Sequence, residues 1–147
     1  MKAEIYLVDN MSWDEIFLCV KFNSVLSKST ADKIVQKFLE GAGPLYMDPL
    51  KFDYYKDDKG NQTTDNIYSI YIVIYDDEII LDNNRLNKHI DIIRESILSV
   101  IDAEVKNAVD YSELENSIKK KLTDRHSTIT PLFLHVGKKL NIQYINP

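Results

Sequence analysis

A stripe of apolar residues at helical spacing constrains this chain more than any other feature of its sequence. The stripe consists of Leu86, Ile90, Ile93, Ile97, Val100, Ile101 and Val105. Residues at steps of three and four lie on one side of an α-helix. Two asparagines, Asn83 and Asn84, stand where capping residues are favoured. We therefore predict one long helix over Asn84–Ala108, packed through its apolar side on a sheet.

Two segments near the N-terminus have the pattern of β-strands. Residues Ala3–Val8 alternate with a period of two, as in a half-buried strand. The segment Ile16–Phe22 is apolar on both sides and rich in aromatic and β-branched residues, which favours a central strand. A helix is the alternative for this segment, because Ser12 and Glu15 have the spacing of a capping box. We predict the strand.

The middle of the chain predicts a helix followed by a hairpin. Capping residues and helical spacing indicate a helix over Thr30–Glu40. The segments 51–56 and 67–75 have the composition of two strands, and the polar loop 57–61 lies between them. We expect one more short strand, Ile79–Leu81, before the long helix.

The C-terminal part predicts a charged helix and a second hairpin. A capping box opens a helix over residues 112–122, and the segments Leu132–Val136 and Leu140–Ile145 alternate as strands do. A length of 147 residues suits one hydrophobic core, so we expect a single domain over residues 1–147. Its fold class is α+β, a mainly antiparallel sheet in the order ββ-α-βββ-αα-ββ with one long helix packed on a face.

Composition limits where such a protein works. The longest apolar runs, Ile16–Val20 and Ile70–Tyr75, are far shorter than the roughly 20 residues of a membrane-spanning helix. The first residues lack the uninterrupted apolar stretch of a signal peptide. The single cysteine, Cys19, cannot form an internal disulfide and falls in a strand that we expect to be buried. We therefore expect a cytoplasmic protein with no membrane contact.

No group of residues in the sequence forms a recognisable catalytic motif. His89 has no carboxylate or second histidine on its side of the long helix and is expected to be an ordinary surface histidine. One alternative is a small phosphoesterase-like hydrolase that uses His126 and His135 as acid and base. Another is a metal-dependent hydrolase that binds its ion through Asp76–Asp82. The balance favours a protein that is not an enzyme, with no cofactor and no metal.

Charge is distributed unevenly along the chain. Residues 48–82 hold nine acids and three lysines, a local charge of −6, whereas residues 116–147 carry +5. Six tyrosines lie in or near the acidic segment, namely Tyr46, Tyr54, Tyr55, Tyr68, Tyr71 and Tyr75. Tyrosine is enriched in protein interfaces, and a field of carboxylates accelerates encounter with a basic partner. The alternative interpretation is that Tyr68, Tyr71 and Tyr75 belong to the core and that the acids are simply solvated.

The acidic, tyrosine-rich segment predicts a surface that binds a basic protein. The residues expected to form this surface are Asp57, Asp58, Tyr54, Tyr55, Asp76, Asp77, Glu78 and Asp82. Small size, acidity and the lack of a motif favour an immunity-type protein, a non-enzymatic inhibitor that covers the basic cleft of a nuclease toxin. A phage or mobile-element protein that blocks a host defence complex is one alternative, and a homo-oligomer joined by strand edges is another. Because the net charge is −5, we expect no direct binding of nucleic acid.

Overall fold

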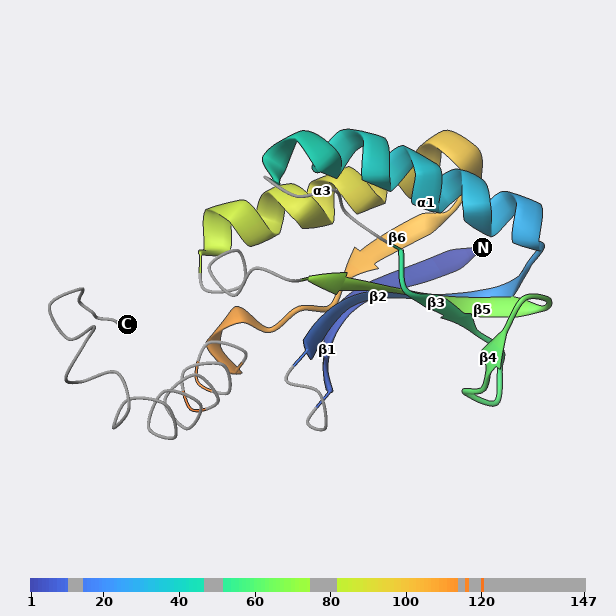
Figure 1. Ribbon diagram of the computed structural model, residues 1–147, viewed down its shortest axis with the longest axis horizontal. Coiled ribbons are helices and arrows are strands. Elements are labelled where there is room, and N and C mark those ends of the chain that lie inside the picture. The colour runs from blue at the N-terminus through green and yellow to red at the C-terminus, as the bar shows by residue number, and fades with distance from the viewer. Residues whose placement is uncertain (11–14, 47–51, 75–81, 114–115, 117–119, 121–147) are drawn as a thin grey trace, which may run out of the picture. The chain divides into compact units, whose positions relative to one another are not determined.

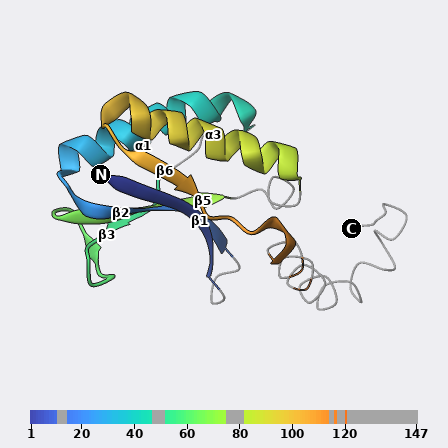
Figure 2. The same cartoon turned by 180° about the vertical axis from the view of Figure 1, so that it is seen from behind.

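A computed structural model of the chain describes residues 1–10, 15–46, 52–74, 82–113, 116 and 120. The described residues confirm the predicted α+β class: one sheet of six strands carries two α-helices, which lie side by side on the same face (Figure 1 and Figure 2). The chain divides into two compact units, residues 1–109 and 110–147. The sheet and both helices belong to the first unit.

The sheet is mainly antiparallel and has the strand order β4-β3-β5-β2-β1-β6. Its strands are β1 (Lys2–Asn10), β2 (Glu15–Leu26), β3 (Tyr54–Lys56), β4 (Gln62–Thr63), β5 (Ile67–Ile74) and β6 (Glu104–Asn107). Only the β1–β6 pair among these strands is parallel. The short strands β4 and β6 are therefore the two edges of this sheet.

The central position of β2 explains why its sequence is apolar on both sides. β1 pairs with one edge of β2 and β5 with the other, and Ile16–Val20 is buried. The strand predicted over Ile16–Phe22 is thus confirmed. The antiparallel pairing predicted for segments 51–56 and 67–75 is also confirmed by β3 and β5. The loop 57–61 does not join these two strands, however, because it connects β3 to the short strand β4, which was not predicted. The strands expected at Ile79–Leu81 and within 132–145 lie outside the described residues.

The two helices begin at side-chain caps. α1 (Lys28–Ala42) starts after Ser27, whose Oγ accepts a hydrogen bond from Thr30 N at 3.2 Å, and a 3-10 turn (Gly43–Leu45) follows it. α3 (Asn83–Val100) starts after Asp82, which accepts a hydrogen bond from Asn84 N at 2.9 Å. Because such caps satisfy N–H groups that have no partner within the helix, they fix where each helix begins.

The long helix ends earlier than the sequence predicts. α3 stops at Val100, and the following residue takes extended backbone. Residues 104–107 then form β6, whose ladder includes Glu104 N donating to Met1 O at 2.9 Å. The prediction of a helix as far as Ala108 is therefore wrong over residues 101–108. Of the helix predicted over residues 112–122, residues 112, 113, 116 and 120 are helical, and the others are not described.

The main core lies between the sheet and the two helices. Ile5, Val20 and Ile70 stand beside one another on β1, β2 and β5, and their side chains are fully buried on the helix side of the sheet. Phe38 of α1 and Ile93 of α3 are equally buried from the helix layer. These buried residues explain why the face of the sheet toward the helices is apolar. The apolar residues that alternate with them point to the opposite face.

Candidate contact surface on the helix-free face of the sheet

The predicted partner-binding acids lie at two different ends of β5. Asp57 and Asp58 follow β3, whose last residue pairs near the start of β5. Asp82 caps α3, and in Figure 1 the first turn of α3 lies toward the opposite end of β5. Asp76, Asp77 and Glu78 lie outside the described residues. The described acids of the predicted surface therefore do not form one cluster.

Two of these acids also shape the local backbone. Asp57 Oδ1 accepts hydrogen bonds from Lys59 N and Asn61 N, both at 2.9 Å, within a turn in which Gly60 has a φ of +83°. Asp82 caps α3. Aspartate is favoured at both kinds of position because its short side chain reaches nearby N–H groups. Local structure thus accounts for Asp57 and Asp82 without a partner.

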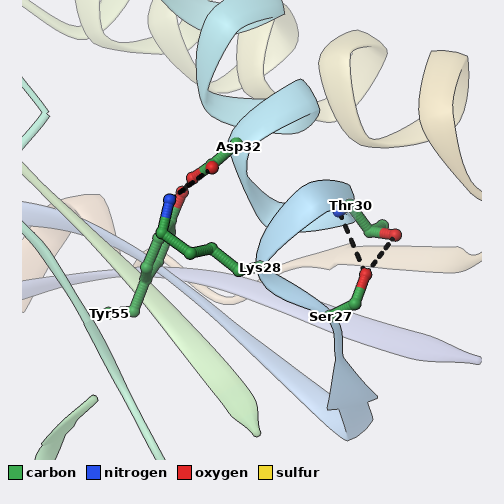
Figure 3. Close-up of polar contacts among 5 residues, drawn as sticks. All are labelled: Ser27, Lys28, Thr30, Asp32 and Tyr55. Carbon is green, nitrogen blue, oxygen red and sulfur yellow. Dashed lines mark hydrogen bonds and ion pairs between the residues drawn. The ribbon is translucent and has the colours of Figure 1, made fainter. Parts of the chain in front are cut away.

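Tyr55 points toward α1 and is only 5% exposed. Its hydroxyl donates to Asp32 Oδ1 at 2.5 Å, and Lys28 Nζ lies 2.7 Å from Asp32 Oδ2 (Figure 3). Desolvation acts to raise the pKa of Asp32, but the hydrogen bonds from Lys28 and Tyr55 and the charge of Lys28 together hold this pKa below its usual value. Tyr55 thus joins the helix layer to the sheet.

We expect Tyr55→Phe to lower the free energy of unfolding by about 1 kcal/mol at neutral pH, because one hydrogen bond to a carboxylate is lost. Asp32 has a lowered pKa in the folded state, so its contribution is present above its unfolded pKa of about 4 and disappears as the pH falls through the folded-state value. Urea unfolding of both proteins between pH 7 and pH 2 measures this dependence. A difference that stayed constant over the whole range would contradict the assignment.

The face of the sheet opposite α1 and α3, which we call the helix-free face with reference to these two helices, carries a second apolar cluster. Phe17, Cys19, Tyr71 and Val73 are buried there, and Tyr6, Val8 and Tyr54 pack against them half-buried. Neither α1 nor α3 lies on this face (Figure 2). Of the tyrosines predicted to contact a partner, Tyr54 belongs to this cluster.

Four residues of this cluster form a row that runs across four strands. Strand pairing places Tyr6, Cys19, Tyr71 and Tyr54 side by side, and we call them the aromatic row. The rings of Tyr54 and Tyr71 stack with centroids 5.0 Å apart and planes 8° apart. Phe17 meets both rings edge-on, with centroid distances of 5.8 and 6.0 Å. The rings of Tyr54 and Tyr71 therefore pack on each other and on Phe17.

The polar atoms at the centre of the aromatic row are neutral near pH 7. The Cys19 thiol shares hydrogen bonds with the hydroxyls of Tyr6 and Tyr71. Burial raises the pKa of Cys19 more than these hydrogen bonds and the charges of Lys56 and Lys21 lower it. Burial also raises the pKa of Tyr71 to about 12. Cys19 is thus a structural thiol and not an activated nucleophile.

We expect Cys19 to react with a thiol reagent only when the sheet opens. Its side chain is fully buried and its thiolate is disfavoured, so the reaction of the folded protein should be slower than that of the unfolded chain by at least about 100-fold. Absorbance after addition of a chromogenic disulfide reagent, with and without urea, measures both rates. A reaction equally fast in both conditions would show that the thiol is accessible.

A second row beside the aromatic row carries lysines. Pairing of five strands aligns Lys106, Glu4, Lys21, Ser69 and Lys56, which we call the lysine row. Its formal charge is +2, opposite in sign to the whole chain. Lys56 Nζ lies 4.5 Å from the ring centroid of Tyr71, a cation–π distance, and so joins the two rows.

Sequence reasoning missed most of this face because strand register creates it. Glu4, Lys21 and Lys106 are far apart in the chain, and no local pattern relates them. The available signal was the apolar character of both sides of the segments that became β2 and β5. Such strands need cover on both faces, whereas the prediction assigned only the long helix to a face of the sheet.

His89 is 1% exposed, so the prediction of a surface histidine is wrong. Its Nδ1 lies 2.8 Å from Arg85 O, and the ring of Tyr46 meets the imidazole edge-on with a centroid distance of 5.3 Å. His89 follows Leu86 by three residues and precedes Ile93 by four, which places it on the apolar side of α3. His126 and His135 lie outside the described residues.

Within the described ranges, no three side chains of His, Cys, Asp or Glu are grouped closely enough to hold a metal ion. No helix in the same ranges is long and apolar enough to cross a membrane. No family model, no curated protein and no solved structure matches this chain. The candidate site therefore rests on the geometry of the chain's own residues.

Proposed function

We propose that this chain is a non-enzymatic, immunity-type inhibitor that binds a partner protein through the helix-free face of its sheet. One observation carries the proposal: α1 and α3 cover one face of the sheet, and the opposite face bears the aromatic row bordered by the lysine row. Tyr6 and Tyr54 of this row are half-buried and remain accessible to a partner. Tyrosine rings offer large contact area with few rotatable bonds, so their burial against a partner costs little side-chain entropy. Such a face is suited to binding another protein.

The acidic segment contributes to this proposal at longer range. A net charge of −5 accelerates the approach of a partner that is basic overall, such as a nuclease toxin. The short-range contacts are made on the helix-free face, where the lysine row meets an acidic part of that partner. Asp58 is exposed beside β3 and is available for such steering. Neutralising Asp57 and Asp58 should therefore slow association, whereas changes on the helix-free face should speed dissociation.

Affinity capture with matched variants tests the proposal. The bait proteins are the wild type, Tyr54→Ala on the helix-free face, and Lys37→Ala on the exposed side of α1. We expect a protein from the native host to be retained by the wild type and by Lys37→Ala, and its activity to fall when the chain is added. Truncating one central tyrosine should weaken binding by about 2 kcal/mol, or about 30-fold in Kd.

Two outcomes would overturn this function. One is equal retention of the same protein by Tyr54→Ala and the wild type, which would remove the face from the interface. The other is a hydrolytic activity of the purified chain that accounts for its effect without a bound partner. Melting temperatures of all three baits provide the control for folding.

A further inference from the structure

The two rows form parallel stripes of different chemistry. Neighbouring strands lie about 4.8 Å apart, so residues paired across several strands form a straight line perpendicular to them. Residues two positions apart on a strand lie about 6.6 Å apart, which is the distance between the aromatic row and the lysine row. A bound segment that matches both stripes is therefore elongated and lies across the strands. It has one apolar side and one acidic side.

The packing of the rings indicates that the bound segment belongs to a protein and not to a nucleic acid. Single-stranded nucleic acids bind such platforms by stacking bases on free ring faces. Here Tyr54 and Tyr71 stack on each other, and Lys56 lies over the ring of Tyr71. A base would have to displace these contacts. Glu4 also interrupts the lysines and would repel a continuous run of phosphates.

The spacing of the lysines matches an α-helix better than an extended strand. Lys106 and Lys21 are separated by two strand spacings, as are Lys21 and Lys56, so each gap is about 9.6 Å. Seven helical residues rise about 10.5 Å. On one side of a β-strand, side chains repeat about every 6.6 Å, which fits this gap poorly.

We propose that the helix-free face takes an acidic amphipathic α-helix of the partner protein, laid across the strands. Carboxylates seven residues apart on this helix meet Lys106, Lys21 and Lys56, and its apolar stripe covers Tyr6 and Tyr54, the two half-buried residues of the aromatic row. Glu4 selects against acids placed between those positions, because like charges repel there. This inference rests on the proposed function and specifies the chemistry of the partner at the same face.

Labelled helical peptides test the inference directly. The probe is a peptide of about 22 residues with leucines at the core heptad positions and glutamates at seven-residue steps beside them. Its counterpart has lysines in place of the glutamates, and a single-stranded 20-mer of thymidine is the nucleic-acid control. Fluorescence anisotropy is measured with the wild type, with Lys21→Glu/Lys56→Glu, and with Lys33→Glu/Lys37→Glu on α1 as the matched control.

We expect the acidic helix to bind at least about tenfold more tightly than the basic helix, which corresponds to about 1.4 kcal/mol. The reversal at Lys21 and Lys56 should abolish this preference, and the reversal on α1 should leave it intact. Equal binding of both helices, tighter binding of the thymidine 20-mer, or no binding of the acidic helix at millimolar concentration would overturn the inference. If a captured host protein still depends on Tyr54 but not on Lys21 and Lys56, the inference fails while the proposed function stands.

Discussion

Phe38→Ala should lower the free energy of unfolding by about 3–5 kcal/mol, among the largest losses expected for any single truncation in this fold. Phe38 is 2% exposed and projects from α1 into the core between the helices and the sheet. Its removal leaves a cavity that the packed helices and strands cannot fill, so the lost burial and the cavity both contribute. Urea unfolding followed by circular dichroism measures the change.

The matched control for this truncation is Leu98→Ala. Leu98 lies on α3 and is 49% exposed, so its truncation should change the free energy of unfolding by no more than about 0.5 kcal/mol. Similar losses for Phe38→Ala and Leu98→Ala would mean that the layer of helices on the sheet is not the main core.

Tyr71→Ala should lower the free energy of unfolding by about 3 kcal/mol, although Tyr71 lies on the helix-free face, opposite α1 and α3. Its ring contacts Tyr54, Phe17 and Lys56, and its hydroxyl shares a hydrogen bond with Cys19. Loss of the ring removes all of these contacts at once. Thermal and urea unfolding of the variant measure the loss.

Tyr71→Phe separates the ring from the hydroxyl. This variant keeps the stacking and should lose only about 1 kcal/mol, the value of one hydrogen bond. It should also leave Cys19 as unreactive as in the wild type, because the ring still covers the sheet. If Tyr71→Phe and Tyr71→Ala lowered the free energy of unfolding equally, the stacked rings would contribute little to stability.

Local patterns were sufficient for the elements whose burial depends on their own periodicity. β2 was predicted over Ile16–Phe22 because β-branched and aromatic residues occupy both of its sides, and a strand with neighbours on both edges needs that pattern. α1 was predicted from capping residues near Thr30 and from its apolar spacing. Its observed caps are Ser27 and Gly43, so the helix extends by two residues at each end beyond the expected Thr30–Glu40. These features depend on residues close together in the chain.

The end of α3 depends on a contact with a distant part of the sequence. Val105 continues the apolar stripe at helical spacing, and no glycine or proline marks a stop after Val100. Residues 104–107 leave the helix because they pair with β1 at the other end of the chain, and Arg94 Nη1 donates to Val105 O at 2.7 Å. A pairing over some hundred residues leaves no local signal, so tertiary structure overrides the helical pattern.

The candidate site was only partly predictable for the same reason. Tyr54 was named from its tyrosine-rich surroundings, and it does lie on the helix-free face. The lysine row was not foreseen, because it exists only when five strands are aligned in register. Asp82 was named for its charge, whereas its position before a helix start was a better guide to its role as a cap.

The most direct test of the central claim is lysine footprinting of the chain with its captured partner. Acetylation followed by mass spectrometry compares the free and bound chain at every lysine. We predict that binding protects Lys21, Lys56 and Lys106 on the helix-free face and leaves Lys33 and Lys37 on α1 unchanged. Protection of the α1 lysines, with unchanged acetylation of the other three, would contradict the claim that this protein binds through the helix-free face of its sheet.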